Sequence, residues 1–404
     1  MKTSKVLLTL TFFFVVALSV YGYFNPSMVS VAKSMASSVV SSTSSQSTKL
    51  NIGTIEIRAI VANIDELGDR YGSYGQKFTQ SKLTEVEQAL SRLNKFVKQS
   101  SYGQTTLKYT AAGVFELGSG VCTQTTYGDQ VNDLIQRALV AADAVKPLKD
   151  YSHYLIVHPL PDCADGVTWS YEGRGQFKSY ILNGKTVHLR GIRISELSDQ
   201  YLFHEFGHTL AYQDNTSIGH PDYLNCPVTL SGGINNIVIS DSCPHIYDYY
   251  TGETPIFTMM STPSILSDYS AIEKEIAGWL SSKNIVTTTS GTYKLSPLEQ
   301  NTSKQKVLKI PVVGTNYNVY LSFRQPKGYT YPATENSKPN GVIMDIVSGA
   351  NASFLVTDSL NKDAPLEVGK PYRLGTNGPI ITVSKISKNI ATVSVTSSTT
   401  SSAK

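Results

Sequence analysis

The fold of this chain is decided by residues 202–210, LFHEFGHTL, in which two histidines stand four residues apart. Apolar side chains recur around them as in a helix that is buried against a core. They are Leu202, Phe203, Phe206 and Leu210. Ser195 and Ser198 are candidate N-caps, because a serine hydroxyl accepts a hydrogen bond from the free N–H groups of a first helical turn. The sequence therefore predicts an α-helix within residues 195–212.

That helix carries the spacing H-E-x-x-H at His204, Glu205 and His208. Residues four apart lie one turn above each other, so both imidazoles can bind one tetrahedral Zn²⁺ ion. Glu205 is rotated by about 100° from His204, which directs it to a water molecule beside the metal. The pattern predicts one catalytic zinc ion and Glu205 as the general base. The alternative is a structural helix on which two histidines and a glutamate meet by chance.

A third ligand is needed if one coordination position is to stay open to water. The extended pattern, H-E-x-x-H-x-x-A-x-x-D, is similar to the metzincin layout H-E-x-x-H-x-x-G-x-x-H/D, with Ala211 at the usual glycine and Asp214 last. An alanine adopts the turn made by that glycine at a cost of about 1 kcal/mol. We expect Asp214 to be the third ligand. The substitutes for it are His220, Asp222, His245, Asp248 and Glu253.

Further motifs make the chain resemble the immune inhibitor A-like (thuringilysin-type) zinc metallopeptidases. Besides His204–Asp214, they are the methionine-containing turn Thr258–Ser261 and the stretch Tyr269–Trp279, YSAIEKEIAGW. Ser101–Gly103, after an amphipathic helix, and the strand around Leu155–His158 are also similar to that family.

The resemblance spans about Ile55–Trp279 and implies a secreted endopeptidase that acts on proteins or peptides. It implies an α+β, metzincin-like catalytic domain, a twisted sheet with the active-site helix, followed by an all-β domain that includes Val319–Arg324. The chain departs from the family at Ala211 and in the insertion Asn215–His245, which we expect to shape a substrate rim. Some relatives bind calcium, but no D-x-D-x-D-G loop is present, so no calcium ligand is assigned.

The N-terminus predicts export from the cell. Lys2 and Lys5 precede the apolar run Val6–Val20, and Gly22 offers a cleavage point, as in a signal peptide. The alternative is an uncleaved membrane anchor, since an apolar run extended to Phe24 comes near the length needed to cross a bilayer. Both alternatives place the rest of the chain outside the cell, either secreted or at the cell surface.

Composition indicates a folded protein of two domains. The chain has 404 residues, 41% hydrophobic and 16% charged, and single cores seldom grow beyond about 250–300 residues. A formal net charge of +4 without a dense Lys/Arg run excludes a nucleic-acid partner. No second apolar run approaches the length that spans a membrane, so any membrane contact is limited to the N-terminal segment.

Residue patterns divide the chain into five parts. Residues 1–24 are the signal or anchor, 25–50 a Ser/Thr-rich tether, 51–281 the catalytic domain, 282–398 a β-rich domain and 399–404 a disordered tail. In the catalytic domain we expect a strand over Gly53–Val61, a helix whose apolar face runs from Leu83 to Val97 and ends at Gly103, a second helix over Val131–Ala142 and a strand over Tyr154–Val157. In the β-rich domain, strands are expected within Val307–Val313, Tyr317–Phe323 and Gly341–Val347.

Four cysteines in an exported chain predict two disulfides, and we favour Cys226 with Cys243 and Cys122 with Cys163. The alternative is four buried free thiols. Sequons at Asn215, Asn301 and Asn351 predict glycans.

Two other functions share these residues. One is a cell-surface binding or structural protein whose peptidase fold is inactive. The other is a metal hydrolase that acts on another bond, such as an amide of the cell wall.

Overall fold

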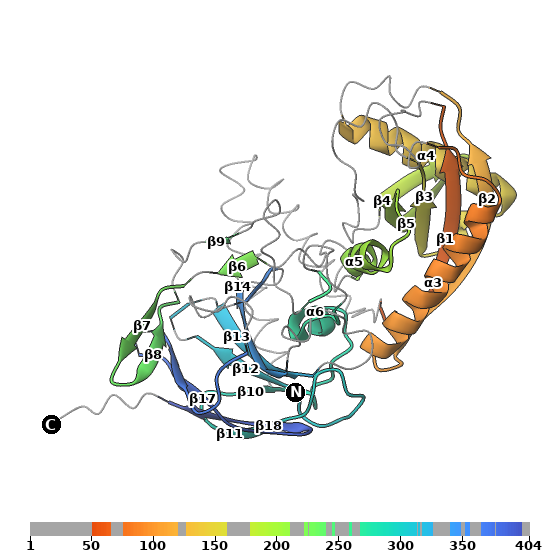
Figure 1. The fold of residues 1–404 in the computed structure, drawn as a ribbon. Coiled ribbons are helices and arrows are strands. Elements are labelled where there is room, and N and C mark those ends of the chain that lie inside the picture. The colour runs from red at the N-terminus through yellow and green to blue at the C-terminus, as the bar shows by residue number, and fades with distance from the viewer. Residues whose placement is uncertain are drawn as a thin grey trace, which may run out of the picture. The chain divides into compact units, whose positions relative to one another are not determined.

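The computed structural model in Figure 1 describes residues 51–65, 76–119, 127–159, 178–210, 222–224, 226–239, 245–246, 258–260, 267–312, 314–315, 317–325, 340–348, 352–355, 365–375 and 377–397. Residues 50–404 belong to one compact unit. The predicted export signal, tether and C-terminal tail lie outside the described residues. None of the helices in the described ranges is both long enough and apolar enough to cross a membrane.

The first sheet has five strands in the order β2-β1-β3-β5-β4. They are β1 (Gly53–Asn63), β2 (Thr105–Glu116), β3 (His153–Val157), β4 (Lys178–Leu182) and β5 (Lys185–Ile194). Strands β2, β1, β3 and β5 run parallel, whereas β4 pairs antiparallel with β5 at the edge. The strands predicted near Gly53 and Tyr154 are confirmed as β1 and β3. Both are buried over nearly their whole length, as expected of parallel strands covered on two faces.

Helices cover both faces of this sheet. Helix α3 (Ser81–Ser100) and helix α5 (Asp199–Thr209) share one core with β1, β3 and β5, and α4 (Tyr127–Val145) lies in a second core with alternate residues of β3. The predicted apolar face of the first helix is confirmed, since Val86, Leu90, Leu93 and Val97 are buried. Helix α3 is followed by Gly103, whose φ of 81° and N–H bond to Lys98 O close the C-terminus as predicted. A short 3₁₀ helix, η3 (Leu148–Asp150), precedes β3.

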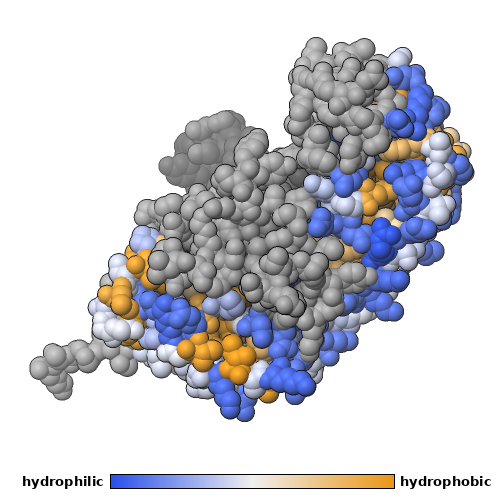
Figure 2. Space-filling view, in the orientation of Figure 1, coloured by the Kyte–Doolittle hydropathy of each residue, from blue (hydrophilic) through white to orange (hydrophobic). Residues whose placement is uncertain are grey.

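The predicted second helix is confirmed as α4. Five of its predicted apolar positions are buried, and these are Leu134, Ile135, Ala138, Leu139 and Ala142. The outer face of α3 is polar, and Figure 2 shows mainly hydrophilic colour over that part of the surface. The helices thus have one apolar side each, turned to the sheet.

The C-terminal part is built from two further sheets. The seven-stranded sheet has the order β10-β12-β13-β14-β15-β6-β9 and the six-stranded sheet the order β11-β18-β17-β16-β8-β7, in which β6 to β9 are short strands within residues 222–246. The strands after residue 281 are β10 (Ile285–Thr287), β11 (Gly291–Leu295), β12 (Val307–Pro311), β13 (Tyr317–Arg324), β14 (Gly341–Ser348), β15 (Ala352–Leu355), β16 (Pro371–Leu374), β17 (Ile380–Ser387) and β18 (Ile390–Thr396). The predicted β-rich texture is confirmed, with the three expected runs forming β12, β13 and β14.

The two C-terminal sheets face each other across one apolar core (Figure 1). Val319 and Leu321 of β13 contribute from one side, and Ile381 of β17 and Val393 of β18 from the other. Burial alternates along β18, as in a strand with one face in a core and one face toward solvent. This part of the chain is therefore a β-sandwich.

Four short strands come from the insertion predicted to belong to the catalytic domain. They are β6 (Asp222–Leu224), β7 (Val228–Ser231), β8 (Ile234–Ile237) and β9 (His245–Ile246). Strand β6 pairs with β15, and β8 pairs with β16, so these residues extend both sheets of the sandwich. Strands of two to four residues cannot form a stable sheet alone, whereas the open edge of a longer sheet offers them partners. The residues of the sandwich are therefore not contiguous in sequence.

Helix α6 (Ala271–Ile276) packs on the seven-stranded sheet. Ala271 and Ile272 share an apolar cluster with Leu298, Val307 and Tyr320. Buried ion pairs lie beside this cluster, between Lys274 and Asp268 at 2.7 Å and between Arg324 and Glu299 at 2.6 Å.

Cys226 lies in the core of the sandwich and is disulfide-bonded. The other three cysteines lie outside the described residues, so the predicted pairings stay predictions. Asn301 is exposed, and the sequons at Asn215 and Asn351 lie outside the described residues.

Candidate metal centre on helix α5

Helix α5 begins at one of the two predicted caps. The Ser198 hydroxyl accepts a hydrogen bond from the N–H of Tyr201 at 3.3 Å. Asp199 stands in the first turn, where its charge suits the positive end of the helix dipole, and it also forms an ion pair of 2.7 Å with Arg92 on α3. The start of the helix is thus held both by its cap and by the neighbouring helix.

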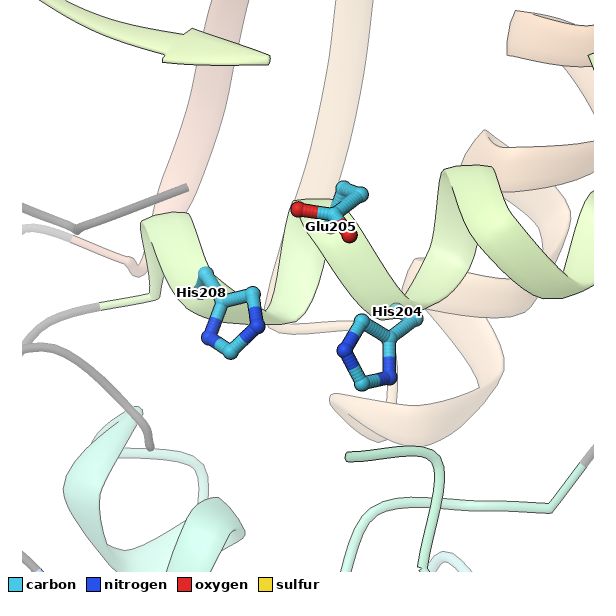
Figure 3. A group of neighbouring side chains, drawn as sticks. All are labelled: His204, Glu205 and His208. Carbon is cyan, nitrogen blue, oxygen red and sulfur yellow. The ribbon is translucent and has the colours of Figure 1, made fainter. Parts of the chain in front are cut away.

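The structure brings the three residues of the H-E-x-x-H pattern together. One ligand atom from each of His204, Glu205 and His208 lies within 4.8 Å of the others. The two imidazole rings are 4.9 Å apart at their centroids and are inclined by 83°. Figure 3 shows both rings leaving the same side of α5, whereas Glu205 leaves the helix at a different angle. This arrangement agrees with the geometry expected from helical spacing.

These three side chains differ in exposure. His204 is 1% exposed and Glu205 6%, while His208 is half-buried. His208 is thus the only one of these three side chains that is partly exposed. Within the described residues, no second group of three His, Cys, Asp or Glu side chains lies close enough to hold a metal ion.

The tautomer of His204 follows from one hydrogen bond. Its Nδ1 lies 3.0 Å from the carbonyl oxygen of Met259. Because a carbonyl can only accept, Nδ1 carries the proton and Nε2 carries the lone pair that a metal needs. A ligating histidine typically donates its other ring N–H to a carboxylate or a backbone carbonyl.

The predicted methionine-containing turn lies against α5. Met260 is fully buried, and a Cβ placed on Gly207 would come within 2.1 Å of the Met260 Sδ. The same Cβ would come within 2.9 Å of the Tyr269 ring, whose hydroxyl donates to the carbonyl of Phe203 at 2.9 Å. Gly207 thus lets Met260 and Tyr269 approach the helix between its two histidines. Ser261 lies outside the described residues.

The end of α5 is held by a buried arginine. The helix ends at Thr209, and Leu210 is already extended. Arg190 of β5 is 1% exposed and donates to the carbonyl oxygen of Thr209 at 2.8 Å. The backbone thus leaves the helical conformation directly after Thr209, one residue beyond His208.

The predicted third ligand, Asp214, lies outside the described residues, as do Ala211, His220, Asp248 and Glu253. Asp222 and His245 fall in β6 and β9, and their side chains are not described. The third ligand therefore stays a prediction.

Two other histidines of the first sheet have a different environment. Burial, reinforced by a nearby arginine, lowers the pKa of both His153 and His158 to about 3. His153 lies 2.8 Å from the Ser152 hydroxyl, and His158 lies 3.0 Å from Arg193. Both imidazoles are therefore neutral parts of the sheet core.

Sequence patterns alone missed several residues of this site. Ser270 and Glu273 were missed although their spacing is a capping-box signal in the sequence. The structure shows that capping box at the start of α6. No local signal pointed to Arg190, which reaches the end of α5 from the preceding strand β5, or to the Met259 carbonyl, which lies fifty-five residues beyond His204.

The chain matches no known family model, and no curated protein matches it.

Proposed function

We propose that this chain is a zinc-dependent endopeptidase, secreted or tethered at the cell surface, with a metzincin-like catalytic fold. The observation that carries the proposal is the pair of imidazoles on one side of α5, beside the Glu205 carboxylate and with the Nδ1 proton of His204 held by Met259. The predicted location rests on the N-terminal sequence.

The donor set suits zinc. Imidazole nitrogen and carboxylate oxygen are both common zinc ligands. Burying a carboxylate beside two imidazoles is costly in an ordinary core, and a divalent cation offsets that cost. His204, through Nε2, and His208 would hold the ion, and Asp214 is the proposed third ligand.

Each residue then has a defined task in peptide hydrolysis. When bound, zinc supplies a Lewis acid that polarises the scissile carbonyl and lowers the pKa of water. Glu205 takes a proton from the attacking water on a carboxylate oxygen, as the water oxygen bonds to the carbonyl carbon. Glu205 then delivers that proton to the amide nitrogen as the C–N bond breaks, which leaves a carboxylic acid and an amine. The Met259 carbonyl keeps His204 in one tautomer throughout.

The test uses the purified full chain, its zinc content and the cleavage of an unstructured protein such as casein. Glu205→Ala should keep zinc and lose turnover by about 10²–10⁴-fold, the usual contribution of a general base. His204→Ala should lose zinc. Glu196→Ala, just before the helix, is the matched control and should keep both.

Three outcomes would overturn the proposal. A wild-type protein that binds no zinc would contradict the proposed metal site. Unchanged turnover in Glu205→Ala would contradict the assignment of Glu205 as the general base. Bound zinc without cleavage of any protein or peptide would instead support an inactive binding protein or a hydrolase of another bond.

A further inference from the structure

The segment that orients His204 is itself held from the other side. The Thr258 hydroxyl accepts a hydrogen bond from the N–H of Met260 at 3.2 Å. The same hydroxyl donates its single proton to the carboxylate of Glu273, with one oxygen at 2.6 Å and the second also in contact. Thr258 therefore links the backbone around Met259 to the Glu273 carboxylate of α6.

Glu273 has a fixed position. Its carboxylate accepts from the N–H of Ser270 at 2.6 Å, and its own N–H donates to the Ser270 hydroxyl at 3.3 Å, which together form a capping box. The residue is 1% exposed. Burial raises its pKa to about 7, although the hydrogen bonds from Thr258 and Ser270 act in the opposite direction. The position of this acceptor is therefore set by the start of its own helix, α6.

Helix α6 is in turn fixed by buried charges on both sides. Lys274 donates to Asp268 at 2.7 Å and to the carbonyl of Ser100, at the end of α3, at 2.9 Å. Arg324 of β13 donates to the carbonyl of Asp268 at 3.3 Å. The helix that carries Glu273 is thus joined to the first core and to the β-sandwich.

We propose that Glu273, acting through Thr258, is a positioning residue for the metal site, because it holds the 258–260 segment so that the Met259 carbonyl sets the ring of His204. The inference rests on the proposed zinc site. It assigns no chemical step to Glu273, which touches neither the metal ligands nor a reacting atom in the contacts above.

Zinc affinity is the direct readout. It is measured on the full chain by competition with a chelating indicator at pH 8, together with kcat, KM and thermal unfolding. Thr258→Val removes the hydroxyl at nearly constant shape, Thr258→Ser restores it, and Glu273→Met removes the acceptor at similar volume. Asp345→Asn is the matched control, because it removes a buried carboxylate that acts electrostatically on the same cluster and leaves the Thr258–Glu273 bond in place.

Thr258→Val and Glu273→Met should each weaken zinc binding by about 10-fold, the lower end of the effect of removing partners just outside a metal's ligands. The double variant should be little weaker than either single variant, because both break one connection. Thr258→Ser and Asp345→Asn should bind zinc as the wild type does. The loss should appear mainly in kcat and zinc affinity, with KM little changed.

The positioning role would be refuted if folded Thr258→Val kept wild-type zinc affinity, or if Asp345→Asn lost as much affinity as Glu273→Met. If Thr258→Val did not fold, an unchanged zinc affinity in folded Glu273→Met would refute it equally. A wild-type chain that binds no zinc would be a different result, because it would overturn the proposed function itself.

Discussion

Gly207→Ala should destabilise the protein although alanine is the better helix former. Gly207 lies inside α5 with a helical backbone, so alanine by itself would add about 1 kcal/mol of stability there. The added Cβ would instead stand 2.1 Å from the Met260 Sδ and 2.9 Å from the Tyr269 ring, and real Cβ atoms essentially never come closer than 3.0 Å to another heavy atom.

The size of the effect follows from the packing. The Met260 sulfur would have to retreat by about 1.3 Å to reach the ordinary contact distance of 3.4 Å, and both Met260 and Tyr269 are 0% exposed. Protein cores hold few voids large enough for such a shift, and overpacking costs about 1–3 kcal/mol. An approach of 2.1 Å falls in the upper part of that range, about 2–3 kcal/mol, and the helix gain of about 1 kcal/mol leaves a net loss of about 1–2 kcal/mol.

Urea denaturation of the full chain measures the loss, and a double-mutant cycle tests its cause. Met260→Ala alone should cost about 2–5 kcal/mol as a buried large-to-small change. If the sulfur is the obstacle, adding Gly207→Ala to Met260→Ala should cost nearly nothing more. Gly207→Ala with wild-type stability or better, or strictly additive losses, would refute the packing argument.

Three further predictions concern the buried polar groups around α5 and α6. Lys274→Met leaves the Asp268 carboxylate buried without its 2.7 Å partner, so the free energy of unfolding should fall by about 3–5 kcal/mol in urea; a loss below about 1 kcal/mol would contradict this. Burial raises the pKa of Asp345 from 3.8 to about 7, so the folded state binds more protons than the unfolded state between these values. The wild type should therefore lose stability relative to Asp345→Asn as the pH rises from about 4 to about 7, and a difference independent of pH would argue against it. Tyr269→Phe removes the 2.9 Å bond to the carbonyl of Phe203 and should cost about 1 kcal/mol of unfolding free energy; calorimetry that finds no change would speak against that bond.

Apolar periodicity in the sequence predicted part of the first core. Of the apolar residues of α3 that recur at three- and four-residue steps, all but the half-buried Leu83 are buried, and the apolar run at Tyr154 forms the middle strand of the sheet. Strands β4 and β5 were not predicted, although Asn183-Gly184 between them, with φ of 48° and 75°, is a hairpin signal visible in the sequence.

The strand pairing of the insertion could not be predicted from the sequence. Strands β6–β9 are short and contain no strong alternation, and nothing local indicates that they pair with β15 and β16, more than a hundred residues away. Pairing between distant strands is decided by which sheet edges remain open after the rest of the chain has packed.

The sequence by itself determined the helix α5, two candidate caps at Ser195 and Ser198, and the common side from which His204 and His208 leave it, because helical spacing and capping depend only on near neighbours. Only the tertiary structure decided that the carbonyl of Met259, fifty-five residues further on, meets the Nδ1 of His204. Such a contact depends on how whole elements pack against each other, and no pattern of neighbouring residues encodes that packing.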